Sequence, residues 1–170
     1  PQDYGQALTW YRKAAEQGLV AAQFYLGCMH YIGKGVAQDY SQAAAWFQKA
    51  AEQGNADAQY NVAVSHHTGQ GVPQDYGQAV IWYRKAAEQG NAMAQNNLGT
   101  MYCDGHGVQQ DYETAHVWLN IATVSFAGTD GGAVANTRDA VEQKLTPAQL
   151  ASAQRRAREW QEAFDKRSGK

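Results

Sequence analysis

The chain has 170 residues, 44% of them hydrophobic and 18% charged, which is the composition of a globular protein large enough for one or two domains. Its net charge of −2 supplies no basic excess to neutralise a phosphate backbone, which argues against nucleic acid as a partner. No run of about 18 apolar residues occurs, so the sequence predicts no membrane insertion.

The first predicted helix lies in residues 1–18, and the chain then repeats it. PQDYGQALTWYRKAAEQG returns with two changes at residues 73–90 and in looser form at residues 37–54. Asp-Tyr pairs, tryptophans and glycines recur at a constant spacing of 36 residues, which indicates stacked structural repeats. Because Pro1 falls inside a repeat, we expect a native N-terminal part beyond it and a half repeat that is open to contact there.

Each unit predicts a first helix, a short loop and a second helix. In the first complete unit, an apolar stripe predicts the first helix over residues 20–32. Gly27 lies beside that stripe, where the missing side chain allows a neighbouring helix to approach closely. The glycine-rich loop at residues 33–38 is short enough to join two antiparallel helices.

The second helix has clear start and stop signals. Asp39 is a favourable N-cap, and Gln42 three residues later completes a pattern like a capping box. Gly54 ends the helix, since a left-handed position after the last turn suits glycine. The buried face of this helix is predicted to contain Ala43, Trp46, Phe47, Ala50 and Ala51. One such pair cannot bury both of its apolar faces alone, so it must stack on the next.

The motifs resemble those of a known repeat family. AQNNLGTMYCDGHGVQQDYETAHVWL contains Ala-x-x-x-Leu-Gly, Gly-x-Gly-Val and Asp-Tyr in order, and Trp-Tyr-x-x-Ala-Ala-x-x-Gly follows in the other copies. These motifs resemble Sel1-like repeats, relatives of tetratricopeptide repeats that are common in bacteria. The departures are Val62 and Ala63 in place of Leu-Gly, and His30 and His66 in the slot of Tyr102. The resemblance implies an all-α fold, a right-handed α-solenoid superhelix of stacked antiparallel helix pairs.

The repeats are expected to fill residues 1–128. They divide into the half repeat 1–18 and the complete repeats 19–54, 55–90 and 91–128, with residues 129–170 forming C-terminal capping helices. The last second helix is expected to run half a turn longer than its copies.

Beyond the repeats, the pattern predicts a break at residues 128–132 and a short helix at residues 133–143. A last helix begins with Thr146 as N-cap, followed by proline and with glutamine at its third position. Its apolar seam is predicted to contain Leu150, Ala153, Ala157, Trp160 and Phe164. Arginines, a glutamate and a lysine cover the other faces, as the end of a solenoid requires.

The copies also separate scaffold positions from candidate site positions. A repeat position that holds the same residue in every unit contributes to the packing between repeats. A position whose residue varies between units is free to contribute to partner binding. One varying stripe on the first helices lies opposite their buried face. Its members are Ala21, Phe24, Cys28, Tyr31, Asp57, Tyr60, Val64, His67, Met93, Asn96, Thr100 and Cys103.

Three residues beside this stripe extend the candidate site: Tyr25, Asn61 and Asn97. An asparagine amide both donates to and accepts from a peptide backbone, which suits a binding groove. In tetratricopeptide-type stacks the first helices line the concave wall, so the resemblance implies that the stripe faces a groove for a partner peptide or helix. The alternative is that Phe24 and Tyr60 pack inward as core.

No pattern indicates catalysis, a metal or a cofactor. His30 and His66 are best interpreted as packing residues, and His66 and His67 point about 100° apart on a helix, so they do not share a metal easily. Cys28 and Cys103 are expected to remain free thiols, because about two repeats separate them. The glycine loops lack the lysine-serine ending of a phosphate-binding loop.

The sequence therefore favours a non-catalytic protein-binding adaptor. One alternative is a hydrolase acting on cell-wall or β-lactam substrates, a description attached to some cysteine-rich members of the resembled family. This chain lacks their paired cysteines. A second alternative is an architectural spacer. The resemblance weakly favours a periplasmic or secreted bacterial location over the cytoplasm.

Overall fold

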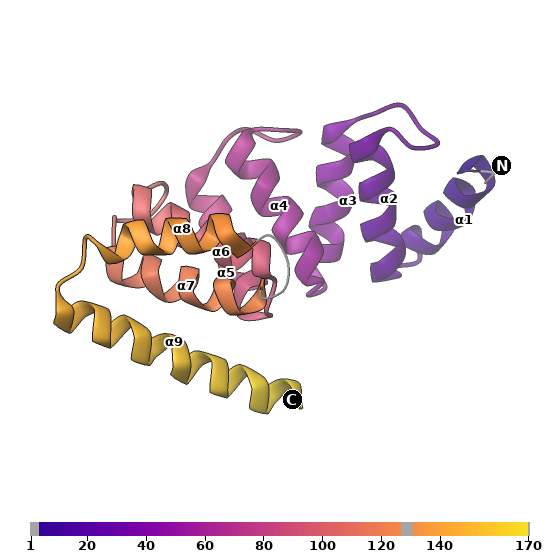
Figure 1. Ribbon diagram of the computed structural model, residues 1–170. Coiled ribbons are helices and arrows are strands. Elements are labelled where there is room, and N and C mark those ends of the chain that lie inside the picture. The colour runs from indigo at the N-terminus through magenta and orange to yellow at the C-terminus, as the bar shows by residue number, and fades with distance from the viewer. Residues whose placement is uncertain (1–3, 127–130, 170) are drawn as a thin grey trace. The chain divides into compact units, whose positions relative to one another are not determined.

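The computed structural model describes residues 4–126 and 131–169, and every regular element in these ranges is an α-helix (Figure 1). The chain forms two compact units, unit 1 (Pro1–Ala86) and unit 2 (Ala87–Lys170), each considered by itself below. The helices are α1 (Tyr4–Glu16), α2 (Val20–Ile32), α3 (Tyr40–Glu52), α4 (Ala56–Thr68), α5 (Tyr76–Glu88), α6 (Ala92–Asp104), α7 (Tyr112–Ser125), α8 (Gly131–Glu142) and α9 (Pro147–Ser168).

Helices that follow one another in the chain pack against one another. In unit 1, α1 contacts α2, α2 contacts α3, and α3 contacts α4. In unit 2, α6 contacts α7 in the same way. The predicted first helix over residues 20–32 coincides with α2, and the glycine loop joins it to α3. The predicted all-α architecture of stacked helix pairs is therefore present.

The second helices begin at aspartates whose side chains accept hydrogen bonds from the first helical turn. The Asp39 carboxylate accepts hydrogen bonds from the backbone N–H groups of Ser41 at 2.9 Å and Gln42 at 3.0 Å. The backbone N–H of Asp39 donates to the His30 carbonyl at 2.9 Å. A reciprocal capping box would need that N–H for the Gln42 side chain. The predicted N-cap is confirmed, but the capping-box pattern is only half realised.

Close approach of helices explains the glycine in the first helix. A Cβ atom on Gly27 would lie 2.6 Å from the ring of Phe47 on α3. In unit 2, a Cβ on Gly99 would lie 2.7 Å from Leu119 on α7. Both distances are shorter than carbon atoms tolerate, so each glycine gives its neighbour room to pack. The predicted role of Gly27 is confirmed.

A buried glutamine links consecutive helices in each repeat. Its role was not predicted from the sequence. The Nε2 groups of Gln23, Gln59 and Gln95 each donate, at 3.1 Å, to a backbone carbonyl near the end of the preceding second helix. In unit 1 the amide of Gln53 also donates to Gln23 Oε1 at 2.7 Å and to the Gly18 carbonyl at 3.2 Å. These bonds satisfy polar atoms that would otherwise be costly to bury.

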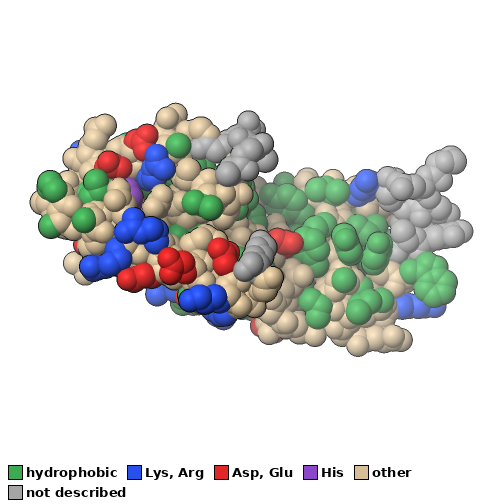
Figure 2. All heavy atoms as spheres, turned by 60° about the horizontal axis from the view of Figure 1, so that its bottom comes forward, with side chains coloured by type: hydrophobic (Ala, Val, Ile, Leu, Met, Phe, Trp, Pro, Cys, Tyr) green, Lys and Arg blue, Asp and Glu red, His purple; other side chains and the backbone are tan. Residues whose placement is uncertain are grey.

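Among the described helices of unit 1, α1 packs mainly against α2. Leu8, Ala14 and Trp46 pack around a buried cluster formed by α1 and α2. Trp10, by contrast, is 72% exposed, whereas Trp82 in the equivalent slot is 8% exposed. Figure 2 shows hydrophobic side chains gathered over α1 to α3. Trp10 of α1 is therefore accessible, whereas Trp82 of α5 is enclosed.

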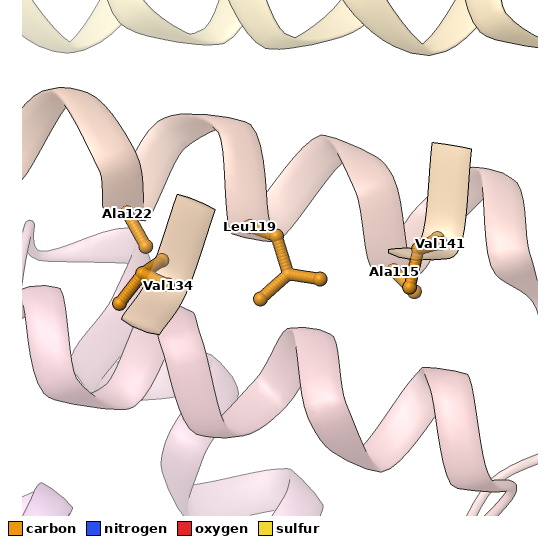
Figure 3. Packing of buried hydrophobic residues seen from close by; sticks show 5 residues of the cluster. All are labelled: Ala115, Leu119, Ala122, Val134 and Val141. Carbon is orange, nitrogen blue, oxygen red and sulfur yellow. The ribbon is translucent and has the colours of Figure 1, made fainter. Parts of the chain in front are cut away.

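In unit 2, α8 packs against α7 and closes a separate core. Its buried members are Ala115, Leu119 and Ala122 of α7 with Val134 and Val141 of α8 (Figure 3). Helix α7 ends one residue beyond the length of its copies, rather than half a turn.

Helix α8 also begins earlier than predicted, at Gly131 instead of residue 133, and ends at Glu142. Gly131 and Gly132 therefore belong to a helix, whereas the rest of the predicted break, residues 127–130, lies outside the described residues. The two glycines cost helix stability, but packing of Val134 and Val141 on α7 offsets that cost.

Helix α9 starts and packs as the sequence predicts. Thr146 and Gln149 form a complete capping box, with Pro147 at the first helical position. Ala153 and Ala157 are buried against Val117 and Ile121 of α7. Figure 2 shows Lys, Arg, Asp and Glu side chains along the other side of this helix. The seam predicted for the last helix is confirmed at its buried centre.

Candidate functional site

The first helices α2, α4 and α6 each bury one face and leave another accessible. Their buried positions are filled by small or apolar residues, in order Ala22, Leu26 and Met29; Ala58, Val62 and Ser65; and Ala94, Leu98 and Met101. We use the name first-helix stripe for the twelve predicted residues opposite this face. Each of the twelve is half-buried or exposed. Tyr25, beside the stripe, is 51% exposed.

On α2, the aromatic side chains of the stripe lean against one another and against α3. The ring of Phe24 lies 5.9 Å from that of Phe47, and the ring of Tyr31 lies 5.2 Å from that of Tyr40. Tyr25 lies 5.8 Å from Phe24 on its other side. Such contacts restrict the rotamers of the aromatic side chains before any partner arrives.

On α4, a buried tyrosine of the next helix supports two stripe residues. His67 Nδ1 lies 3.2 Å from the hydroxyl of Tyr83, and the ring of Tyr60 lies 6.0 Å from the ring of Tyr83. Tyr83 is only 1% exposed. His67 also meets Tyr76 edge-on at 5.6 Å. Tyr60 and His67 therefore contribute to packing as well as to the surface.

The stripes of α2 and α4 come close together within unit 1. The Tyr31 hydroxyl donates to Gln70 Oε1 at 3.5 Å, just after the end of α4. Burial, and then the nearby Asp57 carboxylate, raise the pKa of the Cys28 thiol. Tyr31 and Cys28 of α2 thus interact with residues on α4 or just after it.

The asparagines are partly engaged within their own helices. Asn61 Nδ2 donates to the Asp57 carbonyl at 2.7 Å, and Asn96 Nδ2 lies 3.4 Å from Asn97 Oδ1. The Thr100 hydroxyl donates to the Asn96 carbonyl at 3.1 Å. One amide hydrogen of Asn61 is therefore already used within α4.

Comparison with known protein families matches the Sel1 repeat to residues 1–19, 20–55, 56–91 and 92–123. The chain belongs to the Sel1-repeat family. The match covers well over half of the chain, and its boundaries follow the helix pairs described above.

Solved Sel1-repeat structures are similar to this chain. The crystal structure of a Sel1 repeat protein from Oxalobacter formigenes is 35% identical with a TM-score of 0.71, covering 74% of this chain and 52% of that one. The crystal structure of c5321, a protective antigen present in uropathogenic Escherichia coli strains displaying an SLR fold, is 33% identical with a TM-score of 0.56. That match covers 96% of this chain and 43% of c5321.

The chain thus spans about half the length of these solved relatives. Among curated proteins none matches. Sel1-repeat proteins generally mediate protein–protein interactions on a scaffold that is typically non-catalytic, and the family and its structures confirm an all-α solenoid. They do not favour the hydrolase alternative.

The cysteines of this Sel1-repeat chain lie in surroundings that disfavour a thiolate. Both are free and half-buried. Burial raises the pKa of Cys103, and the neighbouring Asp104 carboxylate raises it further. A catalytic cysteine needs the opposite shift, toward the reactive thiolate at neutral pH.

The histidines are spread over several environments. His30 is buried and His66 half-buried in the tyrosine slot, and the Nδ1 atoms of both lack a hydrogen-bond partner. His106 lies in an exposed loop. Within residues 4–126 and 131–169, no three His, Cys, Asp or Glu side chains are grouped as a metal site requires. Among the same residues, no helix combines the length and apolar character needed to cross a membrane.

His116 is the most deeply buried histidine of the described chain, at 1% exposed. Its Nε2 lies 3.5 Å from Glu142 Oε2 on α8. Burial lowers the pKa of His116 below its ordinary value of 6.5, although Glu142 and Asp139 oppose this shift and Arg138 adds to it. The neutral imidazole is therefore the form that the folded protein favours.

We expect acid to destabilise unit 2 through this histidine. His116 binds a proton more readily in the unfolded chain than in the folded one. The contribution of the neutral, buried His116 to the free energy of unfolding is therefore complete above pH 6.5, and it is lost as pH falls through the lower pKa of the folded state. In His116→Val, which copies Val80 of the equivalent slot, the free energy of unfolding should fall less steeply on acidification. Urea titrations from pH 7.5 down to about pH 5 measure the two slopes. Equal slopes in both proteins would exclude this role for His116.

Proposed function

We propose that the chain is a non-catalytic adaptor that binds an extended peptide or a helix of a partner protein on the first-helix stripe. One observation carries the proposal. The stripe remains accessible in every repeat and varies between repeats, although the opposite faces of the same helices are buried. Positions that varied only for packing would be enclosed. The proposal places the contact on α2 and α4 of unit 1.

The chemistry of the stripe suits a protein partner. Tyrosine and phenylalanine are enriched at the centres of interfaces because they bury a large area at low entropic cost. Phe24 and Tyr31 are already held by Phe47 and Tyr40, so less rotamer freedom is lost on binding. Asp57 is the charged member of the stripe and supplies an acceptor for a donor group of the partner.

Site-specific photocrosslinking in cells tests this proposal. A photoreactive phenylalanine is placed at Tyr25 in one variant and at Ile81 in another, within the full-length protein. Both residues are exposed, at 51% and 48%, but Ile81 lies on α5, away from the stripe. We expect one defined crosslinked partner from position 25 and none from position 81. Crosslinks of equal yield at both positions, or none at position 25, would contradict the proposal and favour an architectural spacer.

The affinity of the crosslinked partner then gives a quantitative prediction. Because Tyr25 touches the surface aromatic side chains but is half solvent-exposed, Tyr25→Ala should weaken binding by about 1–2 kcal/mol, roughly tenfold, with little change in stability. Ile81→Ala is the matched control, with an expected effect near zero. Calorimetric titration and thermal unfolding of both variants make the comparison.

We further propose that residues 129–170 act as a C-terminal cap for the repeats. In the described part of this segment, α8 and α9 both pack on α7. Helix α9 presents small residues to α7, and Arg156 beside this contact pairs with Glu113 of α7 at 3.3 Å. A terminal helix with a charged outer face protects the last repeat from solvent and from further stacking.

A further inference from the structure

The first helices differ from the second helices in the charge that they carry. The sequences of α2, α4 and α6 contain no lysine or arginine, and their only carboxylates are Asp57 on α4 and Asp104 on α6. By contrast, α1, α3 and α5 each carry a lysine in their last turn. In unit 1, the first-helix stripe therefore presents the negative charge of Asp57 and no lysine or arginine.

The Asp57 side chain can be approached from solvent. Asp57 is exposed and lies in the first turn of α4. Burial, and then the Asp57 carboxylate, raise the pKa of the Cys28 thiol, so the carboxylate also lies near α2. A group that reaches Asp57 therefore meets both helices of the unit 1 stripe.

Aromatic rings lie within one helical turn of this position on both helices. Phe24 precedes Cys28 by four residues on α2, and Tyr60 follows Asp57 by three residues on α4, so each pair shares one helix face. The rings of Phe24 and Tyr60 lie 5.9 and 6.0 Å from the buried rings of Phe47 and Tyr83. Both residues are half-buried, so part of each remains accessible. The carboxylate and the rings are therefore available to one incoming side chain.

The second helices show that this protein places cations on aromatic rings. Lys49 Nζ lies 4.1 Å from the centre of the Trp46 ring, and Lys85 Nζ lies 3.9 Å from that of Trp82. In both cases the lysine follows the tryptophan by three residues on the same helix. The first helices cannot supply such a cation to their own rings, because they contain no lysine or arginine. A negative surface with accessible rings is complementary to a cation of a partner.

We propose that the unit 1 stripe binds an arginine side chain of the partner, with its guanidinium on the Asp57 carboxylate and against the rings of Phe24 and Tyr60. This inference rests on the adaptor function proposed above and names the chemistry that the stripe recognises. Arginine suits the site better than lysine, because the planar guanidinium stacks on rings and donates two parallel hydrogen bonds to a carboxylate. An acidic or phosphorylated peptide is disfavoured, because Asp57 repels it and the first helices offer it no lysine or arginine.

Binding of small probes to the whole protein tests the proposal by NMR. The probe is an acetylated and amidated tripeptide with arginine between two glycines, and its analogues carry citrulline, lysine or glutamate at the centre. We expect the arginine probe to shift the amide signals of Cys28, Asp57 and Tyr60 most strongly. Citrulline has nearly the same shape without the charge, so it should bind about fivefold more weakly.

The same titrations contain the results that would overturn the proposal. Equal affinity of the citrulline or glutamate probe would show that charge complementarity does not govern binding. Equal affinity of the lysine probe would overturn the assignment to arginine. Shifts of similar size around every exposed carboxylate would indicate non-specific attraction, and this too would overturn the proposed site.

The variant Asp57→Asn gives a second, independent readout. It keeps the shape of the side chain but removes the charge, so the arginine probe should bind about two- to fivefold more weakly and citrulline should be unaffected. Glu52→Gln is the matched control, since it removes one negative charge from an exposed position of α3 in the same unit. Equal affinities of the probe for the two variants would exclude a specific role for Asp57.

The variant Phe24→Leu tests the contribution of the rings. Leucine retains an apolar contact with Phe47 but has no aromatic face, so the arginine probe should bind about two- to fivefold more weakly to the folded variant. Unchanged affinity would remove Phe24 from the site. Failure of all the arginine titrations, combined with a crosslinked partner at position 25, would overturn this inference alone and leave the adaptor function intact. Absence of that crosslink would instead contradict the adaptor function itself.

Discussion

Gly71→Ala is expected to lower the free energy of unfolding of unit 1 by about 3 kcal/mol or more. Gly71 has a φ of +81°, a region that costs an L-residue about 1–2 kcal/mol. A Cβ at this position would also overlap the backbone carbonyl of Tyr40 and lie 2.9 Å from the Ser41 nitrogen. Because backbone atoms at the start of α3 cannot rotate away as a side chain could, the loop or the helix must move.

Two other glycines provide matched controls in the same unit. Gly69 has a φ of +73°, but the nearest atom to an added Cβ is a side-chain carbon at 3.4 Å. Gly54 has a φ of +91° with nothing within 4 Å. Alanine at either position should therefore cost only the conformational term, about 1 kcal/mol. Urea unfolding of the three variants measures the difference, and a Gly71→Ala cost equal to the others would show that the Tyr40 contact is unimportant.

The helices and their stacking could be predicted because the same capping residues, apolar positions and glycines recur in every repeat. Gly27 illustrates how far this reasoning extends, since its position beside the apolar stripe already indicates a close helix, later found to present Phe47. The predicted last helix was equally well defined, because proline and the capping pair fix its first turn. Local signals of this kind need no knowledge of distant contacts.

The buried glutamines could have been predicted but were not. Gln23, Gln59 and Gln95 recur at 36-residue spacing, which is the same rule that identifies scaffold positions. Glutamine is usually exposed, so a recurring glutamine did not suggest a buried position of the repeat. The hydrogen bond to the preceding helix reverses that expectation, because a satisfied amide is tolerated inside a protein.

Other contacts depend on residues that no local pattern connects. The support of His67 by Tyr83 joins residues 16 apart on different helices, and nothing in either segment indicates the pairing. The start of α8 at Gly131 also depends on a distant contact. Its glycines predict a break in the chain, and only the packing of Val134 on α7 explains why they are helical. In the candidate site, the sequence located the stripe, but only coordinates show which of its residues also support the fold.

Ala153→Glu is expected to release α9 from α7. Ala153 is fully buried against Val117 and Ile121, where a glutamate would introduce a charge with no partner in the contact. An uncompensated buried charge costs about 3–5 kcal/mol, so undocking of the helix becomes the less costly state. Undocking exposes Val117, Ile121 and the Trp118–Trp160 pair, whose rings now lie 5.8 Å apart.

Limited trypsin digestion measures this release, because α9 carries its own cleavage sites at Arg155, Arg156 and Arg158. A docked helix is protected from cleavage in proportion to the free energy of local opening. Ala153→Glu should therefore be cut rapidly within α9, with unit 1 left intact. Ala151→Glu places the same residue on the exposed side of the same helix, so its cleavage rate should match the unmodified protein. Equal protection of both variants would mean that the seam does not hold α9, and the proposed cap would lose its physical basis.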